Sequence, residues 1–109
     1  MPFTLPAETK EGLSKSTMGV YKTRLNRIAE NGIDNLEKLL TKSTHTLRII
    51  NMLVKRELIS EGKTQEQIDK EKRQLRRNYL NAIFYVLPAE VRNAPNPYYK
   101  NFQTAKDPY

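Results

Sequence analysis

The stretch from Leu13 to Gly32, LSKSTMGVYKTRLNRIAENG, carries the start and stop signals of one α-helix. The hydroxyls of Ser14, Ser16 and Thr17 near its start can each accept hydrogen bonds from the free amides of a first helical turn. Gly32 at its end tolerates the left-handed conformation that closes many helices. Between these signals, apolar residues recur at helical spacing: Met18, Tyr21, Leu25 and Ile28. The stretch therefore predicts a helix over Ser16–Asn31.

Two further helices are predicted directly after this one. The run Asp34–Glu37 has the form of a capping box, in which an acidic side chain and a glutamate satisfy the first amides reciprocally. It predicts a short helix that ends near Thr41. Ser43–Thr44 offers the next cap, and the apolar spacing behind it predicts a third helix that reaches about Ile59.

The longest predicted helix follows a break at Ser60–Lys63. Thr64–Gln67 is a second capping box, and Pro88 ends the helix at about Leu87 because proline has no N–H to continue the ladder. The predicted core face of this helix consists of Ile68, Leu75, Tyr79, Ala82, Ile83 and Val86.

No alternating strand pattern, internal repeat or low-complexity tract is present in the sequence. The expected fold is therefore all-α: a compact four-helix domain over residues 14–88 with extended arms at both ends. Residues 1–13 hold two prolines and no period, so they are expected to form a loose arm. In residues 89–109, Pro95 and Pro97 favour extended backbone, which is typical of an arm or an interdomain linker.

Composition excludes several classes of protein. The 109 residues suffice for one domain. Cysteine is absent, so neither a disulfide framework nor thiolate chemistry is available. No apolar run approaches the roughly 20 residues of a membrane span, and the N-terminus lacks the layout of a signal peptide. We expect no membrane partner and an intracellular location, in cytoplasm, nucleus or virion, rather than secretion.

Charge points to the class of partner. Nineteen Lys and Arg residues face twelve Asp and Glu residues, which gives a net charge of +7 and an isoelectric point near 9.7. A basic domain is attracted to polyanions, because neutralising phosphates releases condensed counterions. The simplest alternative is a basic protein that binds nothing in particular.

The last predicted helix concentrates cations. Lys70, Arg73 and Arg77 fall on one stripe together with Phe84, roughly opposite the predicted core face, and Arg76 lies to one side of it. This density of cations is repulsive unless an anion arrives, which favours a ligand-facing patch. The alternative is a solvated face held by pairs of opposite charge one turn apart.

The first predicted helix offers a second anion site. Lys15, Ser16 and Thr17 stand at its N-terminus, where free amides and the helix dipole favour a phosphate. Lys22 flanks the apolar face on the same side as Lys15, and Arg24 flanks it on the other. The alternative is that Ser16 and Thr17 only cap the helix.

Catalysis is not expected. His45 has no acid within five residues on either side, and the sequence contains neither a glycine-rich phosphate loop nor paired carboxylates in an apolar setting. We therefore expect no cofactor, no metal and no enzymatic activity. Tyr98 and Tyr99 in the C-terminal arm could stack on a partner or anchor the arm.

Two stretches resemble a known family. Ser14, Thr17, Tyr21, Leu25 and Ile28 stand in register with the opening helix of the core-binding domain of tyrosine recombinases, the phage-integrase type. That helix typically reads S-x-x-T-x-x-x-Y-x-x-x-L, with an apolar residue one turn later.

The second stretch, Arg76–Leu87, is similar to that domain's last helix, and Asn96–Pro97 resembles the point where it joins the catalytic domain. The resemblance covers about residues 13–97 and implies a SAM-like bundle that clamps double-stranded DNA. In this family a separate domain carries the catalytic residues. Because the chain ends at Tyr109, that residue is not expected to be the nucleophile, and the chain would bind DNA without cutting it.

The leading hypothesis is therefore the DNA-binding domain of an integrase-like protein. Its expected DNA contacts are Lys15, Ser16, Thr17, Lys22, Arg24, Arg73, Arg76 and Arg77. Whether several copies assemble on DNA stays open.

Two other hypotheses remain. In the first, the chain is a small basic structural protein, for example of a virus particle, whose arms Pro2–Leu13 and Pro88–Tyr109 order on protein neighbours. In the second, the chain is a helix-turn-helix regulator, whose turn could only be Leu40–Thr44. The helix after that turn carries only Arg48, Lys55 and Arg56 among mostly apolar residues.

Overall fold

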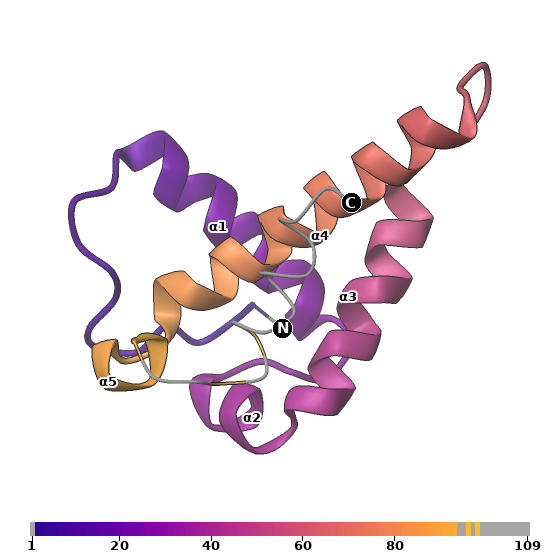
Figure 1. Cartoon of the computed structure of the whole chain (residues 1–109). Coiled ribbons are helices and arrows are strands. Elements are labelled where there is room, and N and C mark those ends of the chain that lie inside the picture. Colours follow the sequence, from indigo (N-terminus) through magenta and orange to yellow (C-terminus); the bar gives the residue numbers. More distant parts are fainter. Residues whose placement is uncertain (1, 94–95, 97, 99–109) are drawn as a thin grey trace.

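The structure, a computed structural model, describes residues 2–93, 96 and 98. Within these residues the chain forms five helices: α1 (Lys15–Ala29), α2 (Leu36–Thr41), α3 (Ser43–Glu57), α4 (Gln65–Val86) and α5 (Ala89–Arg92). The described part contains no strand beyond an isolated parallel bridge between Thr4 and Asn35. The all-α prediction is confirmed, with α5 added to the four predicted helices (Figure 1).

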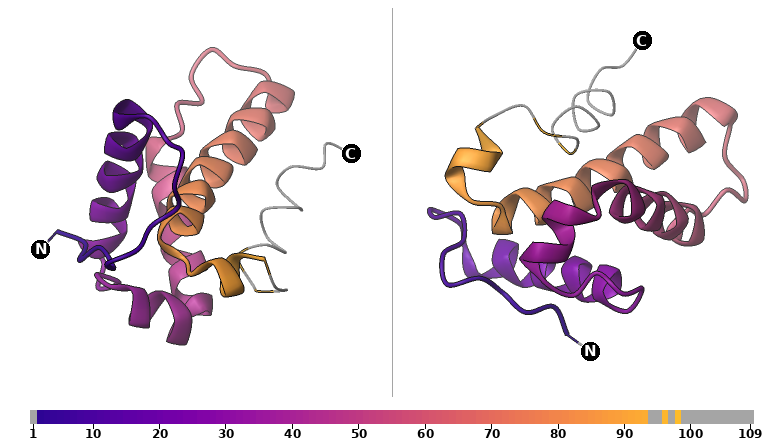
Figure 2. Two further views of the ribbon diagram at one scale, coloured as in Figure 1. Left: turned by 90° about the vertical axis from the view of Figure 1, so that its left-hand side faces the viewer. Right: turned by 90° about the horizontal axis from the view of Figure 1, so that it is seen from below.

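The three long helices α1, α3 and α4 form the body of the molecule, and α2 closes one end of it (Figures 1 and 2). α1 and α4 pack against each other in opposite directions. The ring centroids of Tyr21 and Tyr85 lie 5.5 Å apart, and Arg27, further along α1, reaches Tyr79, earlier in α4. The start of α1 therefore lies beside the end of α4.

Side chains cap the starts of both α1 and α2, at one of the predicted residues in α1 and at a different residue in α2. Ser14 caps α1, because its Oγ accepts a hydrogen bond from the Thr17 amide at 3.2 Å. Asn35, not Asp34, caps α2 by accepting from the Lys38 amide at 2.9 Å. Asp34 instead pairs with the Lys38 ammonium at 3.0 Å, and this hydrogen bond lowers the pKa of the Asp34 carboxyl. The predicted capping box at Asp34 is therefore wrong.

α3 follows α2 after the single residue Lys42. No side chain caps its start, so the predicted cap at Ser43–Thr44 is wrong. The Thr46 hydroxyl, which is buried, donates to the Lys42 carbonyl at 2.8 Å. A helix-turn-helix motif needs a turn of three or four residues, so this hypothesis loses its only candidate turn.

The start of α4 follows prediction. The Thr64 Oγ1 accepts from the Gln67 amide at 3.2 Å, and the Gln67 side chain accepts from the Thr64 amide at 3.0 Å. Of the predicted core face, Ile68 and Leu75 are half-buried and the other four residues are buried. Leu80 and Tyr85 are buried as well, because α4 is covered from more than one side.

The N-terminal arm is not loose. Phe3 is only 7% exposed and belongs to the hydrophobic core. Its amide donates to the Asn26 side chain at 2.8 Å, and the Thr4 amide donates to the Asp34 carbonyl at 2.8 Å. Further on, the Lys10 amide donates to the Tyr85 carbonyl at 2.8 Å. The arm thus contacts both α1 and the end of α4. The sequence did not predict this anchoring, because the arm has no periodic apolar pattern.

The residues after Pro88 are not simply extended. Ala89–Arg92 form α5, and the Arg92 guanidinium donates to the carbonyls of Phe84 at 3.0 Å and Leu87 at 2.7 Å. These bonds satisfy carbonyls that the end of α4 leaves without helical partners. The predicted effect of Pro95 and Pro97 falls outside the described residues.

Tyr98 anchors the C-terminal segment to the domain. Its ring is buried in the core, and its hydroxyl donates to the Leu39 carbonyl in α2. Burial raises the pKa of the Tyr98 phenol to about 12. Of the two alternatives for this residue, anchoring is confirmed, whereas Tyr99 lies outside the described residues.

No helix in the part of the chain that the structure describes is long and apolar enough to cross a membrane.

Replacing Phe3 by alanine tests whether the arm is part of the folded domain. Loss of this buried ring should lower the free energy of unfolding by about 3 kcal/mol, measured by urea denaturation. Thr4→Ala is the matched control, because the Thr4 side chain is exposed and the backbone hydrogen bond remains. Equal stabilities of the two variants would mean that the arm is not anchored.

Burial of Tyr98 predicts a loss of stability at high pH. Between pH 10 and about 12 the unfolded tyrosine releases its proton while the folded one keeps it, so the unfolded state binds fewer protons. The free energy of unfolding should therefore fall by roughly 2 kcal/mol across this window. Urea denaturation at a series of pH values measures the fall, and it should be smaller in Tyr98→Phe. An equal fall in both proteins would contradict the assignment.

Candidate nucleic-acid interface

The predicted DNA-contacting residues form two separate groups. The first lies in the early turns of α1: Lys15, Ser16, Thr17, Lys22 and Arg24. The second lies in the middle of α4: Arg73, Arg76 and Arg77. Because Tyr85 of α4 lies level with Tyr21, the α4 group stands about ten residues, or roughly 15 Å, further along the helix axis. The structure therefore does not gather the eight residues into one patch.

In the α1 group, capping occupies part of the predicted anion site. The Thr17 amide already donates to Ser14, and the Ser14 hydroxyl donates to the Thr17 hydroxyl at 2.9 Å. The cap is thus Ser14 rather than Ser16 or Thr17. Lys15, Ser16 and Lys22 are exposed, whereas Arg24 is half-buried. The exposed cations of this group that a ligand could contact are therefore Lys15 and Lys22.

In the α4 group, the predicted stripe opposite the core is not a free surface. Arg73 and Arg77 are half-buried, and Phe84 packs against the core. The buried surface of α4 extends further round the helix than its apolar spacing indicates. Arg76 lies toward the core edge, as predicted, and its Nε donates to the Asn51 side chain in α3 at 3.2 Å.

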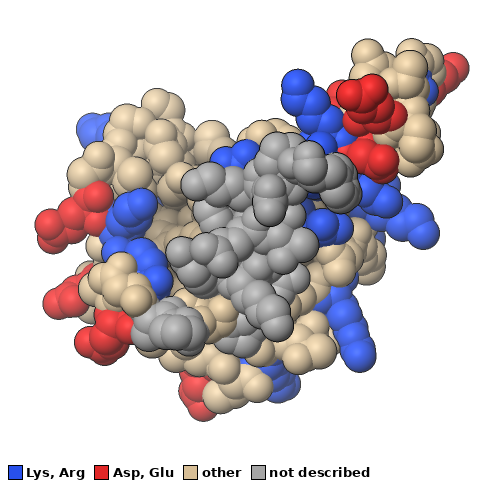
Figure 3. Space-filling view, in the orientation of Figure 1, with Lys and Arg blue, Asp and Glu red and all other residues tan. Residues whose placement is uncertain are grey.

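That contact leads to α3, whose cations the sequence analysis considered only for the helix-turn-helix hypothesis. Arg48, Asn51 and Lys55 follow one another at spacings of three and four on α3, so they share one face of the helix. All three are exposed, as is the neighbouring Arg56. We refer to these four residues together with Arg76 as the α3 face. Figure 3 shows Lys and Arg side chains over this side of the molecule.

The α3 face owes its positive charge to the placement of one acid. Glu57 is the only acidic residue of α3, and it accepts hydrogen bonds from Arg27 and, at 2.5 Å, from the Tyr79 hydroxyl. The hydrogen bond that Arg27 donates to the Tyr79 hydroxyl raises the pKa of the Arg27 guanidinium, and burial raises the pKa of the Tyr79 phenol. The Glu57 carboxylate is thus bonded to side chains of α1 and α4. No other acidic residue of α3 is available to lie on the solvent-exposed side of that helix.

A signal for the α3 face was present in the sequence. The nineteen residues from Lys38 to Arg56 contain five Lys and Arg residues and no Asp or Glu. The spread of these cations over two helices concealed it, because a search for dense clusters favours Arg73–Arg77 instead. Only the position of α3 in the bundle shows which of its residues face solvent.

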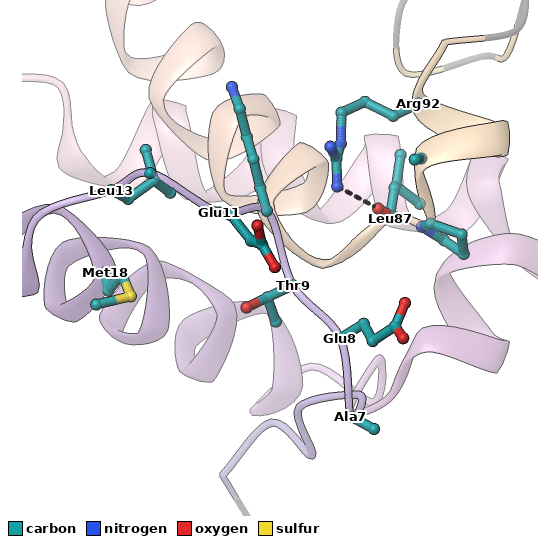
Figure 4. A pocket seen from close by; sticks show the side chains of 12 residues that line it. Ala7, Glu8, Thr9, Glu11, Leu13, Met18, Leu87 and Arg92 are labelled. Atoms are coloured by element: carbon teal, nitrogen blue, oxygen red, sulfur yellow. Dashed lines mark hydrogen bonds between the residues drawn. The ribbon is translucent and has the colours of Figure 1, made fainter.

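A hollow of about 720 Å³ lies elsewhere, between the N-terminal arm and the corner of α4 and α5 (Figure 4). Its apolar lining includes Leu13, Met18 and Leu87. Glu8 and Glu11 project from the arm, and Arg92 on the opposite wall points toward the Leu87 carbonyl. None of the predicted DNA-contacting residues lines it. Within the described residues, no three His, Cys, Asp or Glu side chains gather closely enough to hold a metal ion.

Comparisons with known proteins place the chain in no family. No protein-family model, no curated protein and no solved structure gives a significant match to this sequence or structure.

Tyr79→Phe tests the hydrogen-bonded cluster of Arg27, Glu57 and Tyr79. The variant removes a hydrogen bond to a charged group without opening a cavity, so the free energy of unfolding should fall by about 1.5 kcal/mol. Urea denaturation measures it. Tyr85→Phe is the control, because no hydrogen bond of the Tyr85 hydroxyl is seen among the described residues. An equal effect of both changes would show that the hydroxyl of Tyr79 has no special part.

Proposed function

We propose that this chain binds double-stranded DNA through the α3 face, as the non-catalytic DNA-binding domain of an integrase-like protein. The observation that supports this function is the composition of the face. It presents the cations Arg48, Lys55, Arg56 and Arg76, and the only acid of its helix is turned inward to Arg27 and Tyr79.

The face has the chemistry that a duplex requires. Phosphate oxygens accept hydrogen bonds from Arg and Lys, and such contacts supply most of the affinity. An α-helix fits the major groove, where Arg can bond guanine and an amide side chain can bond adenine. Asn51 stands between Arg48 and Lys55 on α3, so an amide lies within the row of cations. Its bond from Arg76 limits the orientations that the amide can take.

The resemblance to the core-binding domain supports the same function. Leu25 and Ile28, two residues of the resembling helix, are fully buried, and Tyr21 packs against the core. Such burial is what the core positions of the resembling helix require. The SAM-like arrangement and the tyrosine recombinase family remain part of the proposal.

The structural-protein alternative receives less support from the fold. It requires arms that order on neighbouring molecules, but Phe3 is buried in this chain's own core and Lys10 bonds to α4. In the C-terminal arm, Tyr98 is likewise buried in its own domain. The anchored parts of both arms are therefore already engaged.

A salt titration tests the proposal. A labelled duplex of about 30 base pairs is titrated with protein at several salt concentrations, and log affinity is plotted against log salt. Arg48→Ala with Lys55→Ala should weaken binding and reduce the slope by about two units, because each lost phosphate contact removes about one. Lys10→Ala is the charge control, since Lys10 is exposed on the arm away from α3.

Two outcomes would contradict the proposal. If the wild-type protein does not bind the duplex even at low salt, the chain is not a DNA-binding domain. If it binds but the double variant keeps its affinity and slope, the α3 face is not the contact surface. Arg77→Ala would then test the α4 group in the same assay.

A further inference from the structure

The solvent side of α3 carries a narrow stripe of four side chains. Arg48, Asn51, Met52 and Lys55 stand at helix positions i, i+3, i+4 and i+7, so they lie within about 100° of the helix circumference. The buried residues of α3 lie on the opposite side of the helix. Because α3 runs along one edge of the bundle (Figure 1), these four side chains face outward. We refer to them as the α3 stripe.

The Asn51 amide is held in its orientation by a neighbouring helix. The Nε atom of Arg76 in α4 donates to the Asn51 Oδ1 atom at 3.2 Å, which turns the amide oxygen toward α4. Among the residues that the structure describes, the Nδ2 group of Asn51 donates to no protein atom. Because an amide oxygen has two lone pairs, Oδ1 can accept a second hydrogen bond. Asn51 thus presents a donor and an acceptor side by side to a ligand.

Met52 gives the α3 stripe an apolar member. Its side chain is 39% exposed, whereas the other hydrophobic residues of α3 are buried or half-buried. A thioether side chain is flexible and adapts to the surface that it meets. The α3 stripe therefore combines a cation near each end with an amide and an apolar side chain between them.

This combination matches the major groove of DNA, which admits an α-helix. On the groove edge of adenine, N7 accepts a hydrogen bond and the N6 amino group donates one, and an asparagine amide can bond both. The Nδ2 group of Asn51 would donate to N7, and Oδ1 would accept from N6 beside its bond from Arg76. Met52 would contact the methyl group of a nearby thymine. A·T pairs therefore offer a partner to both central side chains.

We propose that α3 enters the major groove and that Asn51 and Met52 select A·T pairs there, while Arg48 and Lys55 contact phosphates on either side. The inference rests on the proposed DNA binding and adds a sequence preference to it. Phosphate contacts alone position a protein on DNA but do not distinguish one base pair from another.

The hairpin between α3 and α4 limits the extent of the contact. It projects beyond the other helices (Figures 1 and 2), and residues 60–71 hold four acids and two lysines, a net charge of −2. Glu61 and Glu66 in it are exposed. Because carboxylates repel phosphates, contact with a duplex should be confined to the turns of α3 before the hairpin.

Selection from DNA duplexes with a randomised centre, followed by affinity measurements at one salt concentration, tests the proposal. The wild-type protein should select an A·T pair, and its replacement by G·C should weaken binding about five- to 100-fold, as expected for a good bidentate contact. Asn51→Ala should remove most of this difference. Asn93→Ala is the matched control and should keep it, because Asn93 is an exposed amide at the end of α5, away from α3 (Figure 1).

Two modified bases assign the contacts to individual side chains. 7-Deazaadenine lacks the N7 acceptor, and uracil lacks the methyl group of thymine. 7-Deazaadenine should weaken binding of the wild-type protein several-fold but not binding of Asn51→Ala. Uracil should weaken binding of the wild type but not of Met52→Ala. Each comparison is a ratio of two affinities of one variant, so a loss of folded protein does not alter it.

Arg76 is a positioning residue in this arrangement, because it acts through the Asn51 amide. Arg76→Ala should therefore lower the ratio of affinities for the adenine and 7-deazaadenine duplexes. Loss of a phosphate contact or of stability alone would weaken binding of both duplexes equally and leave the ratio unchanged.

Failure of this inference and failure of the proposed function give different results. If the wild-type protein binds no duplex even at low salt, both are wrong. If it binds but selects no base pair, or if Asn51→Ala keeps the selection, the inference is wrong while DNA binding through phosphates stands. Equal affinity for an RNA duplex would also overturn the inference, because the major groove of A-form RNA is too narrow for a helix.

Discussion

The hydrogen-bonded cluster of Arg27, Glu57 and Tyr79 holds together the three long helices. One residue comes from each of α1, α3 and α4, and the Tyr79 ring itself is buried in the core. Because a buried phenol must find a partner for its hydroxyl, Tyr79 fixes where the end of α3 lies on α4. The same bond draws the only acid of α3 inward. The packing of the three long helices and the positive charge of the α3 face thus both depend on this hydrogen-bonded cluster.

The distribution of charge follows from that arrangement. A net charge of +7 could be spread evenly, but the fold places cations on the α3 face and acidic side chains on the projecting hairpin between α3 and α4. The α3 face joins cations from two helices through the bond between Arg76 and Asn51.

Local signals in the sequence were reliable where neighbouring side chains did not compete for the same groups. The capping box at Thr64 formed as expected, with Thr64 and Gln67 bonding each other's amides. At the start of α2 the Asp34 carboxylate pairs with the Lys38 ammonium, and Asn35 caps the helix instead. The spacing of apolar residues located α1 and α4 to within two residues but underestimated how much of α4 is buried. A helical period describes one face, whereas α4 is covered from several sides.

By itself, the sequence determined helices α1 to α4, their order and the basic character of the protein, because propensity, capping and composition act over a few residues. Only the tertiary structure decided that the N-terminal arm is a strap anchored by Phe3 and that Tyr98 returns to α2. It also decided that the cations of α3 form a face free of that helix's only acid. These features depend on contacts between residues 22 to 59 positions apart in sequence, and no local pattern records which distant partner a side chain will meet.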